Sequence, residues 1–140
     1  MNSLAIQLTL HGAVIILIGL LCGIPYGSAI THKEDEKKIN AWRLAHSSLA
    51  MGGTTIIAFS AVISNLKLEP ILSNILVISS AVSGYAFAIA LPYAAWVGYR
   101  GLTNEKPGIN QVIYLGNLVG AIGSLVATLV LIIGCLNTLI

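Results

Sequence analysis

The charged residues of this chain lie in three short windows and leave four long uncharged intervals between and outside them. All seven Lys and Arg residues and all five Asp and Glu residues lie within positions 33–43, 67–69 and 100–106. A transmembrane helix needs about 20 apolar residues to cross a hydrocarbon core about 30 Å thick, and each uncharged interval is long enough to cross once. Because 56% of the residues are hydrophobic and only 9% are charged, unlike a soluble domain, the sequence predicts an all-α integral membrane protein.

The four intervals predict four transmembrane helices in a single domain that covers residues 1–140. We expect these helices at about 3–24, 41–66, 71–99 and 109–139. Pro25 is expected to end the first helix, because proline cannot donate the next backbone hydrogen bond. The linkers are short, so consecutive helices should be antiparallel neighbours in a four-helix bundle. No basic segment precedes the first interval, which is longer than the apolar part of a signal peptide, so we expect it to remain in the mature protein.

The loops predict how the chain is oriented and what it contacts. Six of the seven Lys and Arg residues fall in the two loops on one side of the predicted bundle. Such loops usually face the cytoplasm, so we expect both termini outside, in a multi-pass protein of the cell (inner) membrane whose partner is the lipid bilayer. The net charge of +2 is small and confined to loops, which argues against a nucleic-acid surface. Cys22 and Cys135 lie in apolar segments without a CxxC spacing and are predicted to be buried hydrophobic residues.

Glycines recur at helical spacing along three of the predicted helices. They are Gly19, Gly23, Gly27, Gly52, Gly53, Gly116 and Gly120. This spacing lets two helix backbones approach closely in a membrane, either within one chain or between chains. Four helices of this length also form a thin bundle, so we expect a ligand pocket between subunits rather than inside one chain.

The segment "AWRLAHSSLAMGG" at 41–53 carries the main candidate site. An ionisable side chain inside a membrane is costly and indicates function. On a helix, Trp42, Arg43 and His46 share one face, which Ala50 and Gly53 continue. This pattern suits haem, because an imidazole ligates iron, an arginine pairs with a propionate and small residues leave room for the macrocycle. The alternative is an anchor at the membrane interface, in which His46 only makes polar contacts.

Aromatic side chains in the third predicted helix are the other candidates. Tyr85, Tyr93 and Trp96 are spaced by eight and three residues and lie roughly on one face. Trp96 and Tyr99 are predicted to form an interfacial aromatic belt. Tyr85 lies deeper, and Tyr85 or Tyr93 could offer a hydroxyl group to a substrate, so both are predicted catalytic residues.

Three segments together resemble one known family. The stretch "AWRLAHSS" is similar to the W-x-x-x-H-S segment of styrene oxide isomerases, small four-helix membrane proteins that bind haem b through that histidine, and "HGAVIILIGLLCG" and "RGLT" also agree. The resemblance implies a homotrimer with haem b between neighbouring subunits and His46 as the axial iron ligand. It also implies an isomerase that converts a small hydrophobic aryl epoxide to an aldehyde, with ferric iron as the Lewis acid.

The chain departs from that family at three positions. Gly52 stands where the family has an asparagine, and the family's aspartate and tyrosine fall near Ser83 and Leu91. Tyr85 or Tyr93 would replace that tyrosine only if the third helix were shifted or rotated. Haem binding therefore carries over better than substrate handling, and another substrate is compatible with the sequence.

Two further functions fit parts of the sequence. A non-enzymatic b-type haem protein that transfers electrons or senses a gas would use His11 in the first helix as its second iron ligand. The predicted depths argue against this within one chain, because His11 should lie about 10 Å or more below one membrane surface while His46 lies near the other. A scaffold without a cofactor would use Trp42, Arg43 and His46 as an interfacial belt. His32 in the first loop is predicted to be a solvated residue.

Overall fold

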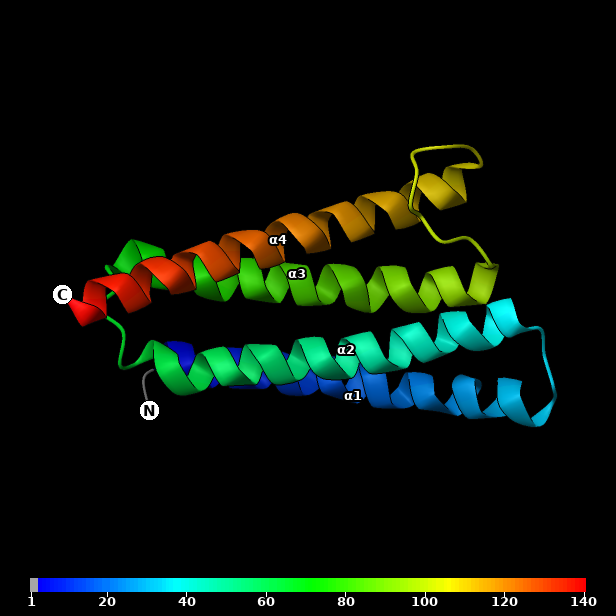
Figure 1. Ribbon diagram of the computed structural model, residues 1–140, viewed down its shortest axis with the longest axis horizontal. Helices are drawn as coiled ribbons and strands as arrows, with labels where there is room; N and C mark the ends of the chain where they lie inside the picture. Colours follow the sequence, from blue (N-terminus) through cyan, green and yellow to red (C-terminus); the bar gives the residue numbers. More distant parts are fainter. Residues whose placement is uncertain (1–2) are drawn as a thin grey trace.

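The computed structural model describes residues 3–140, which form four long helices. These are α1 (Ser3–Thr31), α2 (Glu36–Ile63), α3 (Pro70–Val97) and α4 (Gly108–Leu139). Each is long and apolar enough to cross a membrane, which confirms the prediction of an all-α membrane protein. The helices alternate in direction, so the start of α1 and the end of α4 lie at the same end of the bundle (Figure 1).

The boundaries of α1 and α2 differ from the predicted ones. The prediction that Pro25 ends the first helix is wrong, because Pro25 lies inside α1, which continues to Thr31. A proline removes only one backbone donor, and transmembrane helices tolerate that loss. The second helix begins at Glu36 instead of residue 41, because the Asp35 side chain caps it by accepting a hydrogen bond from the Lys38 N–H at 2.7 Å.

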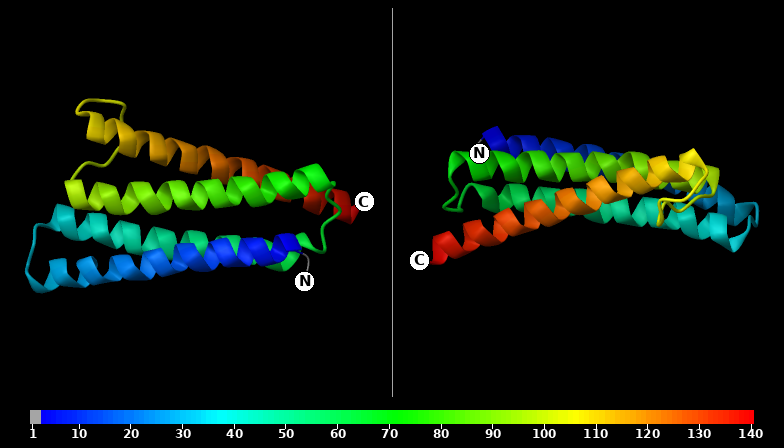
Figure 2. Two further views of the ribbon diagram at one scale, coloured as in Figure 1. Left: turned by 180° about the vertical axis from the view of Figure 1, so that it is seen from behind. Right: turned by 90° about the horizontal axis from the view of Figure 1, so that it is seen from above.

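The helices pack as two antiparallel pairs. Helix α1 packs extensively on α2, and α3 packs extensively on α4. Helix α3 also contacts both α1 and α2, whereas α4 has few contacts with either of them within residues 3–140. Figure 2 shows the reason, since α4 crosses α3 at an angle instead of lying parallel to it. The two pairs are therefore joined mainly through α3.

Glycines bring α1 and α2 unusually close together. A Cβ atom added to Gly12 would lie 2.7 Å from the Gly53 carbonyl oxygen, and one added to Gly53 would lie 2.6 Å from the Gly12 carbonyl oxygen. A Cβ added to Gly19 would lie 2.8 Å from the Ala50 backbone nitrogen. Gly19 and Gly53 therefore serve packing within one chain, which was one of the two uses expected from the spacing.

Outer surfaces are largely apolar, as expected for contact with lipid. Trp96 is 77% exposed near the end of α3, where an interfacial aromatic residue is expected. Cys22 is buried as predicted, but Cys135 is exposed, so the prediction for Cys135 is wrong. Hydropathy cannot separate the two cysteines, because lipid-facing and buried positions of a transmembrane helix are both apolar.

Asn110 at the start of α4 holds the loop that contains "RGLT". Its side-chain oxygen accepts a hydrogen bond from the Gly101 N–H at 3.0 Å, and its side-chain nitrogen donates to the carbonyls of Thr103 and Glu105 at 2.9 and 3.0 Å. Gly101 has a φ of 58°, a conformation that glycine adopts without strain. Asn117 also donates to the Arg100 and Gly101 carbonyls, both at 3.2 Å, so two asparagines of α4 hold the loop between α3 and α4.

Candidate functional site

His46 on α2 is held in a defined orientation by α1. Its Nδ1 atom lies 2.8 Å from the carbonyl oxygen of Gly19. A carbonyl only accepts, so Nδ1 carries the proton and donates, and Nε2 keeps its lone pair. The Tyr26 ring stacks on the imidazole with ring centroids 6.1 Å apart. A Cβ added to Gly23 would lie 3.3 Å from the imidazole, so the absence of a side chain at Gly23 gives the ring its place.

Trp42 and Arg43 occupy the turn before His46, as predicted. Trp42 is half-buried and packs against the core. Arg43 is exposed, and its guanidinium forms no ion pair within residues 3–140. A positive charge at this position is therefore free to bind an anionic group.

Ala50 and Gly53 continue the same face of α2 but lie against α1. The Ala50 backbone nitrogen is close to Gly19, and the Gly53 carbonyl is close to Gly12. Their small size therefore allows α1 to approach, and a role for them beside a cofactor stays a prediction.

His11 and Tyr85 bind each other across α1 and α3. The His11 Nδ1 atom lies 3.0 Å from the Tyr85 hydroxyl oxygen, and the two rings meet edge to face with centroids 5.6 Å apart. His11 therefore acts as an interhelical hydrogen-bonding residue. His11 lies eight residues before Gly19, the contact of His46, which is about 12 Å along α1. The two histidines therefore do not converge within one chain.

Tyr93 and His32 take part in neither the His46 nor the His11 contacts. Tyr93 is half-buried, and its hydroxyl forms no hydrogen bond within residues 3–140, so its predicted catalytic role stays a prediction, as does that of Tyr85. His32 is exposed, with its Nδ1 atom 2.8 Å from the Ser28 carbonyl oxygen. This exposed position agrees with the prediction of a solvated histidine.

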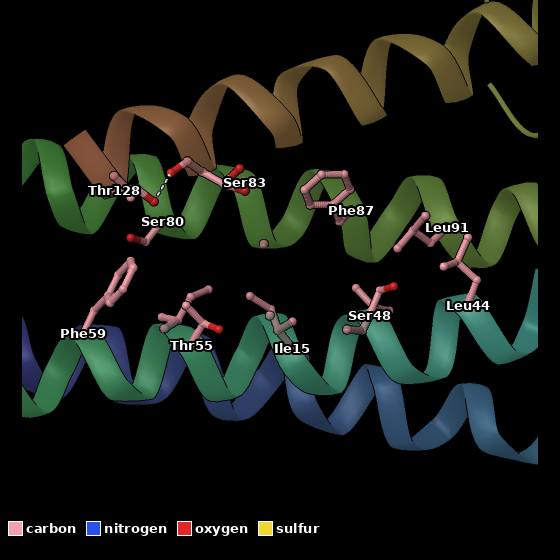
Figure 3. Close-up of a pocket in the computed structure, with 16 residues that line it drawn as sticks. Ile15, Leu44, Ser48, Thr55, Phe59, Ser80, Ser83, Phe87, Leu91 and Thr128 are labelled. Atoms are coloured by element: carbon pink, nitrogen blue, oxygen red, sulfur yellow. Dashed lines mark hydrogen bonds between the residues drawn. The ribbon is translucent and has the colours of Figure 1, made fainter. Parts of the chain in front are cut away.

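A cavity of about 370 Å³ lies between α2, α3 and α4, with Ile15 of α1 also in its wall (Figure 3). Most of its lining is apolar. The side chains with hydroxyl groups are Ser48, Thr55, Ser80, Ser83, Ser124 and Thr128. One chain therefore has more internal space than was expected for a thin four-helix bundle. The space exists because α4 crosses α3 at an angle and leaves α2, and such an angle cannot be derived from residue spacing.

The three positions at which the sequence departs from the family pattern all line this cavity. Gly52 contributes from α2, and Ser83 and Leu91 contribute from α3. Tyr85 and Tyr93 do not line it. Sequence spacing alone did not indicate that Gly52 would meet Ser83 and Leu91, because Gly52 belongs to α2 and the other two residues belong to α3.

His46 and the cavity lie on different sides of α2. His46 does not line the cavity, whose α2 lining consists of Leu44, Ser48, Leu49, Gly52, Thr55, Ile56 and Phe59. At 3.6 residues per turn, the directions of these residues are centred about 135° around the helix from His46, and the nearest, Leu49, is about 60° away. His46 and the cavity are therefore two separate candidate sites on α2.

A second hollow, of about 750 Å³, lies at the end of the bundle where the charged loops are. Its lining includes Lys37, Arg100 and Tyr99. Leu44 and Leu91 line both this hollow and the cavity. These two side chains therefore stand between the polar end of the bundle and the apolar cavity.

Comparison with known proteins identifies a family. The sequence pattern of a family described as styrene oxide isomerase matches residues 4–136, a range that includes His46 and the whole lining of the cavity. A search of curated proteins found no match to the chain.

Proposed function

The chain belongs to the styrene oxide isomerase family, and on this basis we propose that it binds haem b at His46 and converts a small epoxide to a carbonyl compound. The hydrogen bond from His46 Nδ1 to the Gly19 carbonyl, at 2.8 Å, carries the proposal. Histidines that ligate a metal usually donate their other ring N–H to a carbonyl or carboxylate, which fixes the tautomer and the ring orientation. His46 has this arrangement before any cofactor is considered.

The residues around His46 suit the charge and the ligand requirement of haem b. Arg43 lies one turn before His46 on the exposed surface and has no ion pair within residues 3–140, so its guanidinium can pair with a propionate. One histidine is enough to hold a haem iron, which matters because no group of three His, Cys, Asp or Glu residues gathers within residues 3–140. Haem b would supply ferric iron as a Lewis acid that weakens the C–O bond of an epoxide.

The chemistry of the cavity also fits an isomerase. No Asp, Glu, Lys, Arg or His side chain lines it, so it holds no residue that would deliver an activated water to the epoxide. Conversion of an epoxide to an aldehyde breaks one C–O bond and moves a hydride to the neighbouring carbon, and it consumes no water and no electrons. The apolar walls would orient the substrate and exclude water.

A haem protein with His11 and His46 as two ligands of one iron has no support within one chain. His11 is hydrogen-bonded to Tyr85 of α3, whereas His46 is hydrogen-bonded to the Gly19 carbonyl of α1. We therefore do not propose electron transfer or gas sensing.

The chain, purified in mild detergent with haem b, is expected to convert an aryl epoxide to its aldehyde without any added cofactor. Imidazole or cyanide should inhibit the reaction, because either ligand fills the open position on the iron. The measurements are chromatography of the product and the visible spectrum of the ferric protein. A six-coordinate low-spin spectrum with no turnover of aryl or alkyl epoxides would overturn the proposal.

A further inference from the structure

We propose that the Ser80 hydroxyl donates a hydrogen bond to an oxygen atom of the molecule that occupies the cavity. As a statement about the substrate, the inference rests on the proposed function. As a statement about binding, it rests on the cavity alone, because His46 does not line the cavity.

Ser80 is the first observation. It is 2% exposed, and its Oγ atom has no hydrogen-bond partner in the part of the chain that the structure describes. A serine inside a helix normally donates to a carbonyl one turn earlier, as the adjacent Ser79 does to Ile75 at 2.6 Å. Figure 3 shows Ser80 on the side of α3 that faces α2, opposite Phe59. A buried hydroxyl without a partner is costly, so a partner is expected in the cavity.

Most of the other hydroxyl groups that line the cavity already donate a hydrogen bond within the chain, unlike Ser80. Thr55, Ser83, Ser124 and Thr128 each donate to a backbone carbonyl, at 3.0, 2.6, 2.9 and 2.8 Å. These four hydroxyls can therefore only accept from a ligand. Ser48 also lacks a partner within residues 3–140, but it is half-buried, not fully enclosed like Ser80. The enclosed part of the cavity thus offers one free donor, which selects a ligand with an acceptor.

Size and charge define the rest of the ligand. A cavity of roughly 150 Å³ holds benzene in another protein, and the present one is about 370 Å³, which leaves room for a ring with a short substituent. No charged side chain lines the cavity, so a charged ligand would be buried without a counter-charge. An ether or carbonyl oxygen has two lone pairs. A hydrogen bond from Ser80 uses one of them and leaves the other lone pair of the ligand oxygen free for an electrophile.

Gly52 supplies a variant that closes the cavity without disturbing the helix packing. A Cβ added to Gly52 meets no atom within 4 Å, and Gly52 lines the cavity. A leucine there would project into the cavity space. Gly27 is the matched control, because a Cβ added there also meets no atom within 4 Å but Gly27 does not line the cavity.

The test compares two probes of the same shape, acetophenone and α-methylstyrene. Acetophenone has a C=O group where α-methylstyrene has C=CH₂. Binding to the haem-loaded protein in detergent is measured by saturation-transfer NMR. Ser80→Ala is expected to weaken acetophenone binding about tenfold, the effect of one hydrogen bond, and to leave α-methylstyrene binding unchanged. Gly52→Leu is expected to abolish binding of both probes. Gly27→Leu should bind both probes as the unmodified chain does. The same is expected of Ser79→Ala, because the Ser79 hydroxyl donates to its own helix.

Failure of this inference can be told apart from failure of the proposed function. A His46→Ala chain should still bind acetophenone, because His46 does not line the cavity. If this binding is intact and the unmodified, haem-loaded chain converts no epoxide, the proposed function fails and the inference stands. An equal loss of affinity for both probes in Ser80→Ala would overturn the role of Ser80. If the unmodified chain binds neither probe, the cavity holds only water, and the inference is overturned.

Discussion

Replacing His46 with alanine is expected to remove the Soret band of the purified protein completely. Its imidazole is the proposed iron ligand, and the Gly19 carbonyl and Tyr26 hold it in place. No other histidine can take over, because His11 is bonded to Tyr85 and His32 lies exposed in the first loop. The measurement is haem absorbance relative to protein after reconstitution with haem b.

His11→Ala and His32→Ala are the controls, and both should keep the Soret band. Gly23→Ala gives an intermediate case, since its Cβ would lie 3.3 Å from the imidazole. This contact should shift the ring and the position of the Soret band without loss of haem. A His46→Ala protein with full haem occupancy would refute the assignment.

Two adjacent glycines of α2 are expected to respond to alanine with opposite signs. A Cβ at Gly53 would lie 2.6 Å from the Gly12 carbonyl oxygen and 2.9 Å from the Ile16 backbone nitrogen. Backbone atoms cannot move aside without separating α1 from α2, so Gly53→Ala should destabilise the fold by about 3 kcal/mol. A Cβ at Gly52 meets nothing within 4 Å, so Gly52→Ala should stabilise the helix by up to about 1 kcal/mol.

Thermal unfolding in detergent measures both changes. Gly53→Ala should also lower haem occupancy, because separation of α1 from α2 removes the Gly19 carbonyl from His46. Similar melting temperatures for the two variants would contradict the close α1–α2 contact.

The sequence was sufficient for the features that depend on nearby residues. The charge windows predict four spans, and helical periodicity places Trp42, Arg43 and His46 on one face. The Asp35 cap of α2 was also readable, since Asp is a favoured residue at this position, but the charged segment after it was assigned to the loop. The sequence pattern could equally have placed α2 at its observed start.

Features that depend on distant residues were not predictable in the same way. The hydrogen bond between the Tyr85 hydroxyl and His11, 74 residues away, could not be read from the sequence. The close contact of Ala50 and Gly53 with α1 was not readable either. The cavity depends on the angle between α3 and α4, which is set by side-chain packing along both helices and not by the pattern of either one.

The separation of His46 from the cavity bears on which chain would supply which part of the proposed reaction centre. If an iron on His46 acts on a molecule in the cavity, we expect the two to come from neighbouring chains. Such an association would join two unlike surfaces, which forms a ring where the rotation closes, so each proposed reaction centre would belong to a junction and not to a chain. A His46→Ala chain and a Gly52→Leu chain should each be inactive alone. When the two are co-expressed in equal amounts, a junction is active if Gly52→Leu supplies its histidine and His46→Ala supplies its cavity. Random mixing produces this combination in about a quarter of the junctions, so about a quarter of the unmodified activity should return. No recovery in mixed assemblies would show that each chain works alone.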